Sequence, residues 1–116
     1  MLDLFDWVAV PIPGQPAGMA AAEKPEGLPD RAMEFYNHFA DEMKRLRHLD
    51  KVTQGQFELT CIQWDQVTQL AELAEQPETR AAFDRSLELF RLLAGDFGIF
   101  PRAEVGAWWS GYPQLI

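Results

Sequence analysis

Apolar side chains recur at three- and four-residue spacing along most of this chain, and prolines stand where the stretches begin. The spacing predicts three long helices and one short one, over about 29–47, 54–75, 77–95 and 101–109. Pro29, Pro77 and Pro101 suit the first positions of helices, and Gly95 suits the end of the third. Because alternating β-branched runs are absent from the sequence, we predict an all-α fold, a three-helix bundle with a short C-terminal fourth helix.

The second predicted helix has the widest apolar stripe. Thr53 and Gln56 form a capping-box pattern at its start. Its regularly spaced apolar positions are Phe57, Cys61, Trp64, Val67, Leu70, Ala71 and Ala74. Leu59, Ile62 and Leu73 widen this stripe. A stripe of such width is typical of a helix that is buried on more than one side.

Residues 1–28 differ in composition from the rest of the chain. Four of the eight prolines lie there, and those between 11 and 16 exclude a helix, so we predict an extended Pro-rich N-terminal arm. The apolar start of the arm, which includes Trp7, would dock on its own domain or on a neighbour, or form a loosely ordered terminus. The predicted organisation is an arm over 1–28, a helical bundle domain over 29–109 and a C-terminal tail over 110–116.

The net charge of −8 restricts the partners that the chain can bind. As a whole, the chain should be repelled by nucleic-acid phosphates and anionic membranes. The bases nevertheless cluster near the end of the first predicted helix, at Lys44, Arg45, Arg47 and Lys51, with His48 between them. These four bases are the candidate phosphate contacts to DNA. Helix C-termini favour bases for dipole reasons alone, so a capped and solvated helix end is the other interpretation.

Candidate catalytic and metal-binding residues are sparse. Glu34, His38 and Glu42 share one helix face, but a metal site in a bundle needs carboxylates that converge from several helices, so a solvated face is the simpler interpretation. Cys61 is the single cysteine and lies among apolar residues, where it would remain a thiol. Phosphate-loop, hydrolase and zinc-protease motifs do not occur. We therefore expect no enzyme, no cofactor and no metal.

The aromatic residues near the C-terminus form a second group of candidates. Two adjacent tryptophans cannot face the same way on a helix, so Trp108 or Trp109 should meet another element or another subunit. With Tyr112 and Trp7, they are the candidate protein-interface residues. No apolar run reaches the roughly 18 residues of a membrane span, and the N-terminus carries acids where a signal peptide has bases. We expect a soluble protein of the cytoplasm, with no membrane partner.

The order of these segments resembles that of the small terminase subunits of tailed bacteriophages. The resemblance covers about residues 25–103 and runs through PDRAMEFYNHFADEMKRL, the connector RHLDKVTQGQ, the helix with FELTCIQWDQV, and the closing turn LAGDFGIFP. Two segments depart from the family pattern. The junction Glu75–Pro77 is shorter than the usual loop, and RAEVGAWWSGY replaces a polar segment that bears serine and arginine.

The resemblance implies a non-enzymatic component of the DNA-packaging motor. Such a protein forms an oligomer, commonly a ring, that recognises viral double-stranded DNA and regulates the large terminase subunit in the cytoplasm of the host cell. The second departure removes positive charge where DNA contact would be expected. The alternative is an acidic helical adaptor or inhibitor that binds a protein partner without nucleic acid. Its supporting features are the net charge of −8 and the aromatic ends of the chain.

Overall fold

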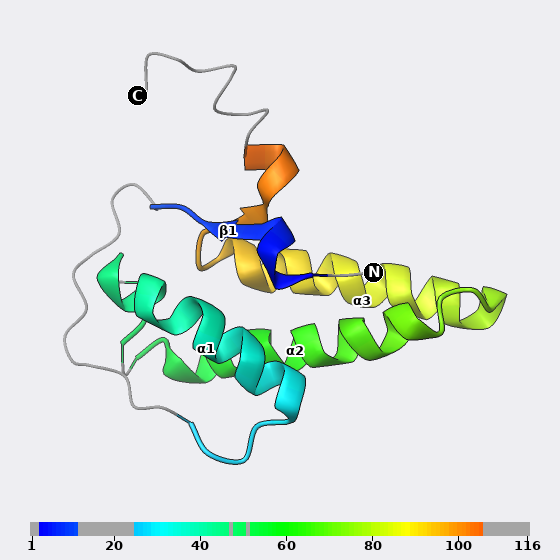
Figure 1. The fold of residues 1–116 in the computed structure, drawn as a ribbon, viewed down its shortest axis with the longest axis horizontal. Coiled ribbons are helices and arrows are strands. Elements are labelled where there is room, and N and C mark those ends of the chain that lie inside the picture. The colour runs from blue at the N-terminus through cyan, green and yellow to red at the C-terminus, as the bar shows by residue number, and fades with distance from the viewer. Residues whose placement is uncertain (1–2, 12–24, 47, 51, 106–116) are drawn as a thin grey trace.

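The computed structural model describes residues 3–11, 25–46, 48–50 and 52–105. Three long helices form the bundle: α1 (Asp30–Arg45), α2 (Gln54–Glu72) and α3 (Pro77–Gly95). Helix α2 packs against both others, and α2 and α3 run side by side as an antiparallel pair (Figure 1). The all-α class predicted from the sequence is confirmed. Residues 102–105 are also helical, and the predicted continuation toward 109 lies outside the described residues.

The start of α2 was predicted at the right place but for the wrong local reason. Helix α2 begins at Gln54, yet Thr53 makes no side-chain capping bond to the helix. Its hydroxyl donates to the carbonyl of His48 at 3.0 Å and accepts from the backbone N–H of Asp50 at 3.0 Å. The side chain of Gln56 donates to Asp96 Oδ2 at 3.0 Å. The capping box is absent because both side chains are used by the connector and by the end of α3.

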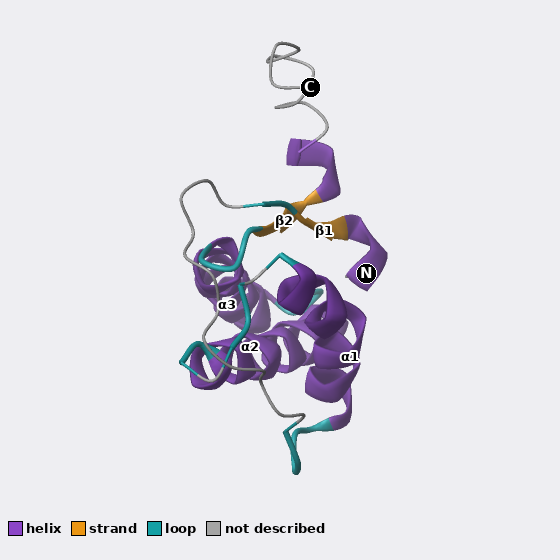
Figure 2. Cartoon of the chain, turned by 90° about the vertical axis from the view of Figure 1, so that its left-hand side faces the viewer, coloured by secondary structure: helices purple, strands orange, loops and turns teal. Residues whose placement is uncertain are grey.

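The arm contributes a short strand, which the sequence patterns did not predict. A 3₁₀ turn, η1 (Leu4–Asp6), leads into β1 (Trp7–Ala9), which pairs antiparallel with β2 (Ile99–Pro101) (Figure 2). Val8 lies opposite Phe100 in this register. Gly98, with a φ of 73°, occupies the left-handed conformation that turns the chain from α3 into β2. Three-residue strands are too short to show the alternation by which strands are recognised in a sequence.

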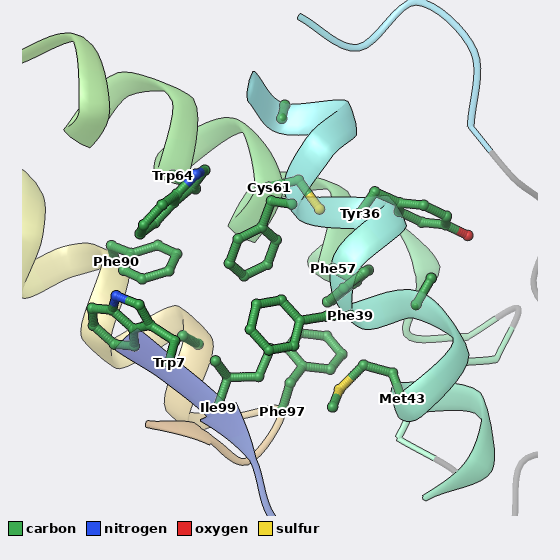
Figure 3. Packing of buried hydrophobic residues seen from close by; sticks show 14 of the residues in the cluster. Trp7, Tyr36, Phe39, Met43, Phe57, Cys61, Trp64, Phe90, Phe97 and Ile99 are labelled. Carbon is green, nitrogen blue, oxygen red and sulfur yellow. The ribbon is translucent and has the colours of Figure 1, made fainter. Parts of the chain in front are cut away.

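The core is built largely from aromatic rings (Figure 3). Phe35 of α1 is fully buried and lies 5.6 Å from Phe90 of α3 and 5.7 Å from Trp64 of α2, between ring centroids. Trp7 of β1 packs edge-on against Phe90 at 5.0 Å and against Trp64 at 6.2 Å. All three helices and the arm therefore contribute to a single core. Edge-to-face pairs of this kind stabilise by about 1 kcal/mol each beyond the area that they bury.

Two buried polar contacts fix how the elements sit on one another. The Nε2 of Gln63 on α2 donates to the hydroxyl of Ser86 on α3 at 2.6 Å and to its carbonyl at 3.0 Å. The Nδ1 of His48 donates to the carbonyl of Phe97 at 2.9 Å. Each bond satisfies a buried group that would otherwise cost about 1–3 kcal/mol to desolvate. Among the described residues, no helix has the length and apolar character needed to cross a membrane.

Candidate functional site

The candidate phosphate contacts lie at the end of α1, where the structure describes two of the four. Lys44 and Arg45 occupy the last turn of α1, and both side chains are exposed. The Arg45 Nε donates to Glu42 Oε2 at 3.0 Å, and its guanidinium also pairs with Glu42 Oε1. These hydrogen bonds lower the pKa of the Glu42 carboxyl, which stays ionised and offsets one positive charge. Lys44 is therefore the described base here without an ion pair of its own. Arg47 and Lys51 lie outside the described residues.

His48 does not belong to the charged surface. Its side chain is buried and holds the carbonyl of Phe97, as described above. The imidazole therefore anchors the connector between α1 and α2 to the turn that follows α3. His48 lies between the bases of the cluster in the sequence, but spacing alone does not show that the connector turns inward at this residue. The charged surface in the described residues therefore contains fewer bases than the sequence has in this segment.

One of the four candidate protein-interface residues is buried, and the other three lie outside the described residues. Trp7 is 5% exposed, and its indole packs inside the core of its own chain. The expectation that Trp7 faces a partner is corrected, and its own domain is where the arm docks. Trp108, Trp109 and Tyr112 lie outside the described residues. An apolar arm residue finds a partner in its own core because β1 pairs with β2 and turns the indole inward.

Two clefts lie at the junction of the arm with the bundle. One, of about 590 Å³, has Leu4, Phe5 and Trp64 in its lining, with the acids Asp3, Glu34 and Glu72 also lining it. Arg31 of α1 pairs with Glu72 of α2 in this cleft. The other, of about 570 Å³, lies between α3 and β2. Its apolar lining includes Trp7, Leu87 and Ile99, and its charged lining includes Asp84, Glu88, Arg91 and Glu104. Both clefts combine apolar walls with an excess of acids.

The remaining candidates for chemistry are arranged as parts of the scaffold. Cys61 is buried in the core, and desolvation raises the pKa of its thiol to about 12. His38 is exposed and packs edge-on against the ring of Phe5 at 5.2 Å. In the described part of the chain, no group of three or more His, Cys, Asp or Glu side chains could hold a metal ion. A buried thiol with a raised pKa is a weaker nucleophile at neutral pH than an exposed one.

One apolar surface, along α2, is exposed in the structure where the sequence pattern did not indicate exposure. Leu59, Ile62 and Leu73, which widen the apolar stripe of α2, are exposed rather than buried. The prediction of burial on more than one side is confirmed, because α2 packs against both α1 and α3, and the residues that widen the stripe lie on a third face that stays exposed. The sequence does contain a signal of this surface, because the apolar stripe of α2 is wider than a single buried face needs. The width alone does not show which residues the other helices leave uncovered.

Comparison of the chain with protein-family models, with curated proteins and with solved structures finds no match.

Proposed function

We propose that this chain is the small subunit of a phage terminase. It is a non-catalytic, oligomeric component of the DNA-packaging motor that recognises viral double-stranded DNA and regulates the large terminase subunit in the cytoplasm of the host cell. The observation that carries the proposal is the order of elements. A helix, a short connector, a long helix, a minimal junction and a third helix that closes on a tight turn follow one another in the order of the resemblance.

The closing turn is the most specific part of that order. Helix α3 ends at Gly95, and the next residues turn through Gly98 into β2, which ends at Pro101. The turn is held from two sides, because β2 pairs with β1 and His48 binds the carbonyl of Phe97. Such a turn positions the segment beyond it relative to the bundle. The aromatic C-terminal residues would then reach a neighbouring copy or the large subunit.

DNA contact is assigned to the bases at the end of α1. Lys44 is exposed and Arg45 keeps a solvent-facing guanidinium beside Glu42, while Arg47 and Lys51 follow within the same segment. One such cluster of bases, here called the basic island, attracts DNA only weakly in a chain of net charge −8. An oligomer would repeat the island at regular intervals, and each additional phosphate contact strengthens binding by counterion release. The acidity of the chain then confines DNA contact to this surface.

Charge reversal tests this assignment. The variant Lys44→Glu/Arg45→Glu/Arg47→Glu should weaken binding to duplex DNA and reduce the slope of log affinity against log salt by about 0.9 for each phosphate that the protein ceases to neutralise. A matched control with the same charge change, Arg80→Glu/Arg91→Glu/Arg102→Glu, places its charges on α3 and just after β2. Fluorescence anisotropy over a salt series measures both. Equal losses of affinity in the two variants, or no loss in the first, would contradict the assigned surface.

A second candidate, the acidic adaptor, is favoured by the cleft between η1, α1 and α2. Three acids line it against one arginine, and Trp64 and Phe5 provide apolar contact. Such a cleft suits a basic segment of a protein partner. A wild-type chain that fails to bind duplex DNA even at low salt, yet forms a stable complex with a protein partner, would favour the adaptor over the terminase subunit.

A further inference from the structure

The most apolar exposed surface of the described chain lies on the two longest helices. Five large side chains are 41–68% exposed there: Leu59 and Ile62 on α2, Leu73 directly after its last residue, and Leu89 and Leu92 on α3. We call these five residues, with Gln66 and Gln69, the outer face. The residues at 59, 62, 66, 69 and 73 alternate between three- and four-residue steps, so they follow one line along the helix. This is the spacing by which helices pair with each other.

The packing of the bundle explains why the outer face stays uncovered. Gln63 of α2 donates to Ser86 of α3, and the two helices run antiparallel. Leu59, one turn before Gln63, therefore lies level with Leu89, almost one turn after Ser86. Helix α1 covers another side of α2, where the ring of Tyr36 contacts that of Phe57 at 5.5 Å. Helices α1 and α3 therefore lie on other sides of α2, and no other described element covers its outer line of residues.

The charges beside the outer face are unevenly placed. Helix α2 carries Glu58, Asp65 and Glu72, each one residue before a position of the outer line and spaced by seven residues. Glu72 pairs with Arg31 of α1, so this acidic flank lies on the α1 side. The outer line itself holds only leucine, isoleucine and glutamine. On α3, Arg85 is exposed and precedes Leu89 by one turn and Leu92 by two, so its positive charge lies in line with the leucines of the outer face.

We propose that the outer face is the surface by which a second copy of this chain binds. Two chains of net charge −8 repel each other, and the outer face lets them approach without acid lying directly against acid. The Nε2 of Gln69 already donates to Asp65 Oδ2 at 2.7 Å, and the amide of Gln66 can both donate and accept hydrogen bonds across a contact between identical lines of residues. The acidic flank of one copy complements Arg85 of the next.

This inference rests on the proposed function to the extent that it names the contact face of that assembly, but its test requires neither DNA nor a large subunit. The variant Leu59→Glu/Ile62→Glu would place two carboxylates in an apolar contact. Burying unpaired carboxylates is unfavourable, so the dissociation constant of the oligomer should rise about 100-fold or more. Sedimentation velocity over a concentration series measures the change. Circular dichroism verifies that the variant keeps its helices.

The control places a single carboxylate on an exposed apolar residue outside the outer face. Phe5 is 68% exposed and lies beside His38 of α1, so Phe5→Glu should leave self-association unchanged. A wild-type chain that sediments as a monomer at every concentration would overturn the inference. Oligomers that persist in Leu59→Glu/Ile62→Glu would overturn the assigned face and leave the assembly itself in place. A monomeric wild type would also contradict the oligomeric subunit of the proposed function, whereas a failure to bind DNA would contradict that function alone and leave the contact face standing.

Thiol labelling provides a second readout that does not depend on a disruptive substitution. In the variant Gln66→Cys, a thiol stands in the middle of the outer line, while the native Cys61 is buried. The rate of maleimide labelling should fall as the protein concentration rises and copies cover the thiol. In Phe5→Cys the rate should stay constant. A Gln66→Cys thiol that remains fully reactive at concentrations where oligomers form would contradict the inference.

Discussion

Helices α1 and α2 have similar roles in the core but differ in what they leave exposed. The large buried side chains of α1 follow one face, and most positions opposite that face are polar or charged. Helix α2 buries Phe57, Cys61, Trp64 and Val67 and still exposes three large apolar side chains. The first helix is therefore satisfied by its own chain. Helix α2 has an additional apolar face, which the other two helices and the β1–β2 ribbon do not cover.

The comparison implies that equally apolar residues on the two helices differ greatly in their effect on stability. Phe35→Ala in α1 should lower the free energy of unfolding by about 3–5 kcal/mol, because the ring is fully buried and its removal leaves a cavity. Leu59→Ala on the outer face should change it by about 0.5 kcal/mol or less in the monomer. Urea denaturation at low protein concentration measures both. If Phe35→Ala does not fold, Phe35→Leu tests the same ordering.

The arm allows the comparison to be tested on the inner face of α2. Trp7→Ala removes the indole that packs against Trp64 and Phe90, and should destabilise the chain by about 3 kcal/mol. The amide of Val10, which donates to the carbonyl of Gly98 beside the ribbon, should exchange faster with solvent in this variant. Phe5→Ala is the control, since Phe5 is mostly exposed. Similar effects of the two substitutions would show that the arm is not part of the core.

Adjacent residues of α2 provide the most local form of the comparison. Burial raises the pKa of the Cys61 thiol from the ordinary value of 9.0 to about 12, whereas Ile62 faces outward. In the native monomer at neutral pH, Cys61 should react with thiol reagents only through unfolding, while an Ile62→Cys thiol should react at once. Mass spectrometry of the labelled chains measures the two rates. A fast reaction at Cys61 would show that the inner face opens readily.

The same shift predicts a dependence of stability on pH. Because the folded chain disfavours the thiolate, the contribution of Cys61 to stability is complete below about pH 9 and is lost as the pH rises toward 12. The free energy of unfolding should fall by up to about 1.4 kcal/mol per pH unit in this window. Burial also raises the pKa of Tyr36, so Cys61→Ala serves as the control that retains the tyrosine contribution. Identical alkaline profiles for the two chains would contradict the buried thiol.

The sequence predicted the helices well because each is specified by local signals. Proline at the start of α3 and Gly95 at its end agree with the structure, and so does the start of α2 at Gln54. The candidate site was predicted less well. His48 and Trp7 are of residue types that are common on surfaces or at interfaces. Both are nevertheless buried by contacts with segments far away in the sequence.

By itself, the sequence determined that this chain forms three long helices, where each begins to within about a residue, and that α2 has more apolar surface than an amphipathic helix needs. Only the tertiary structure decided that residues 7–9 become a strand, that His48 turns inward, and which three residues of α2 stay exposed. The reason is the range of the interactions. Helix formation depends on neighbours within about four residues, whereas strand pairing and burial depend on contacts between residues 40 or more positions apart.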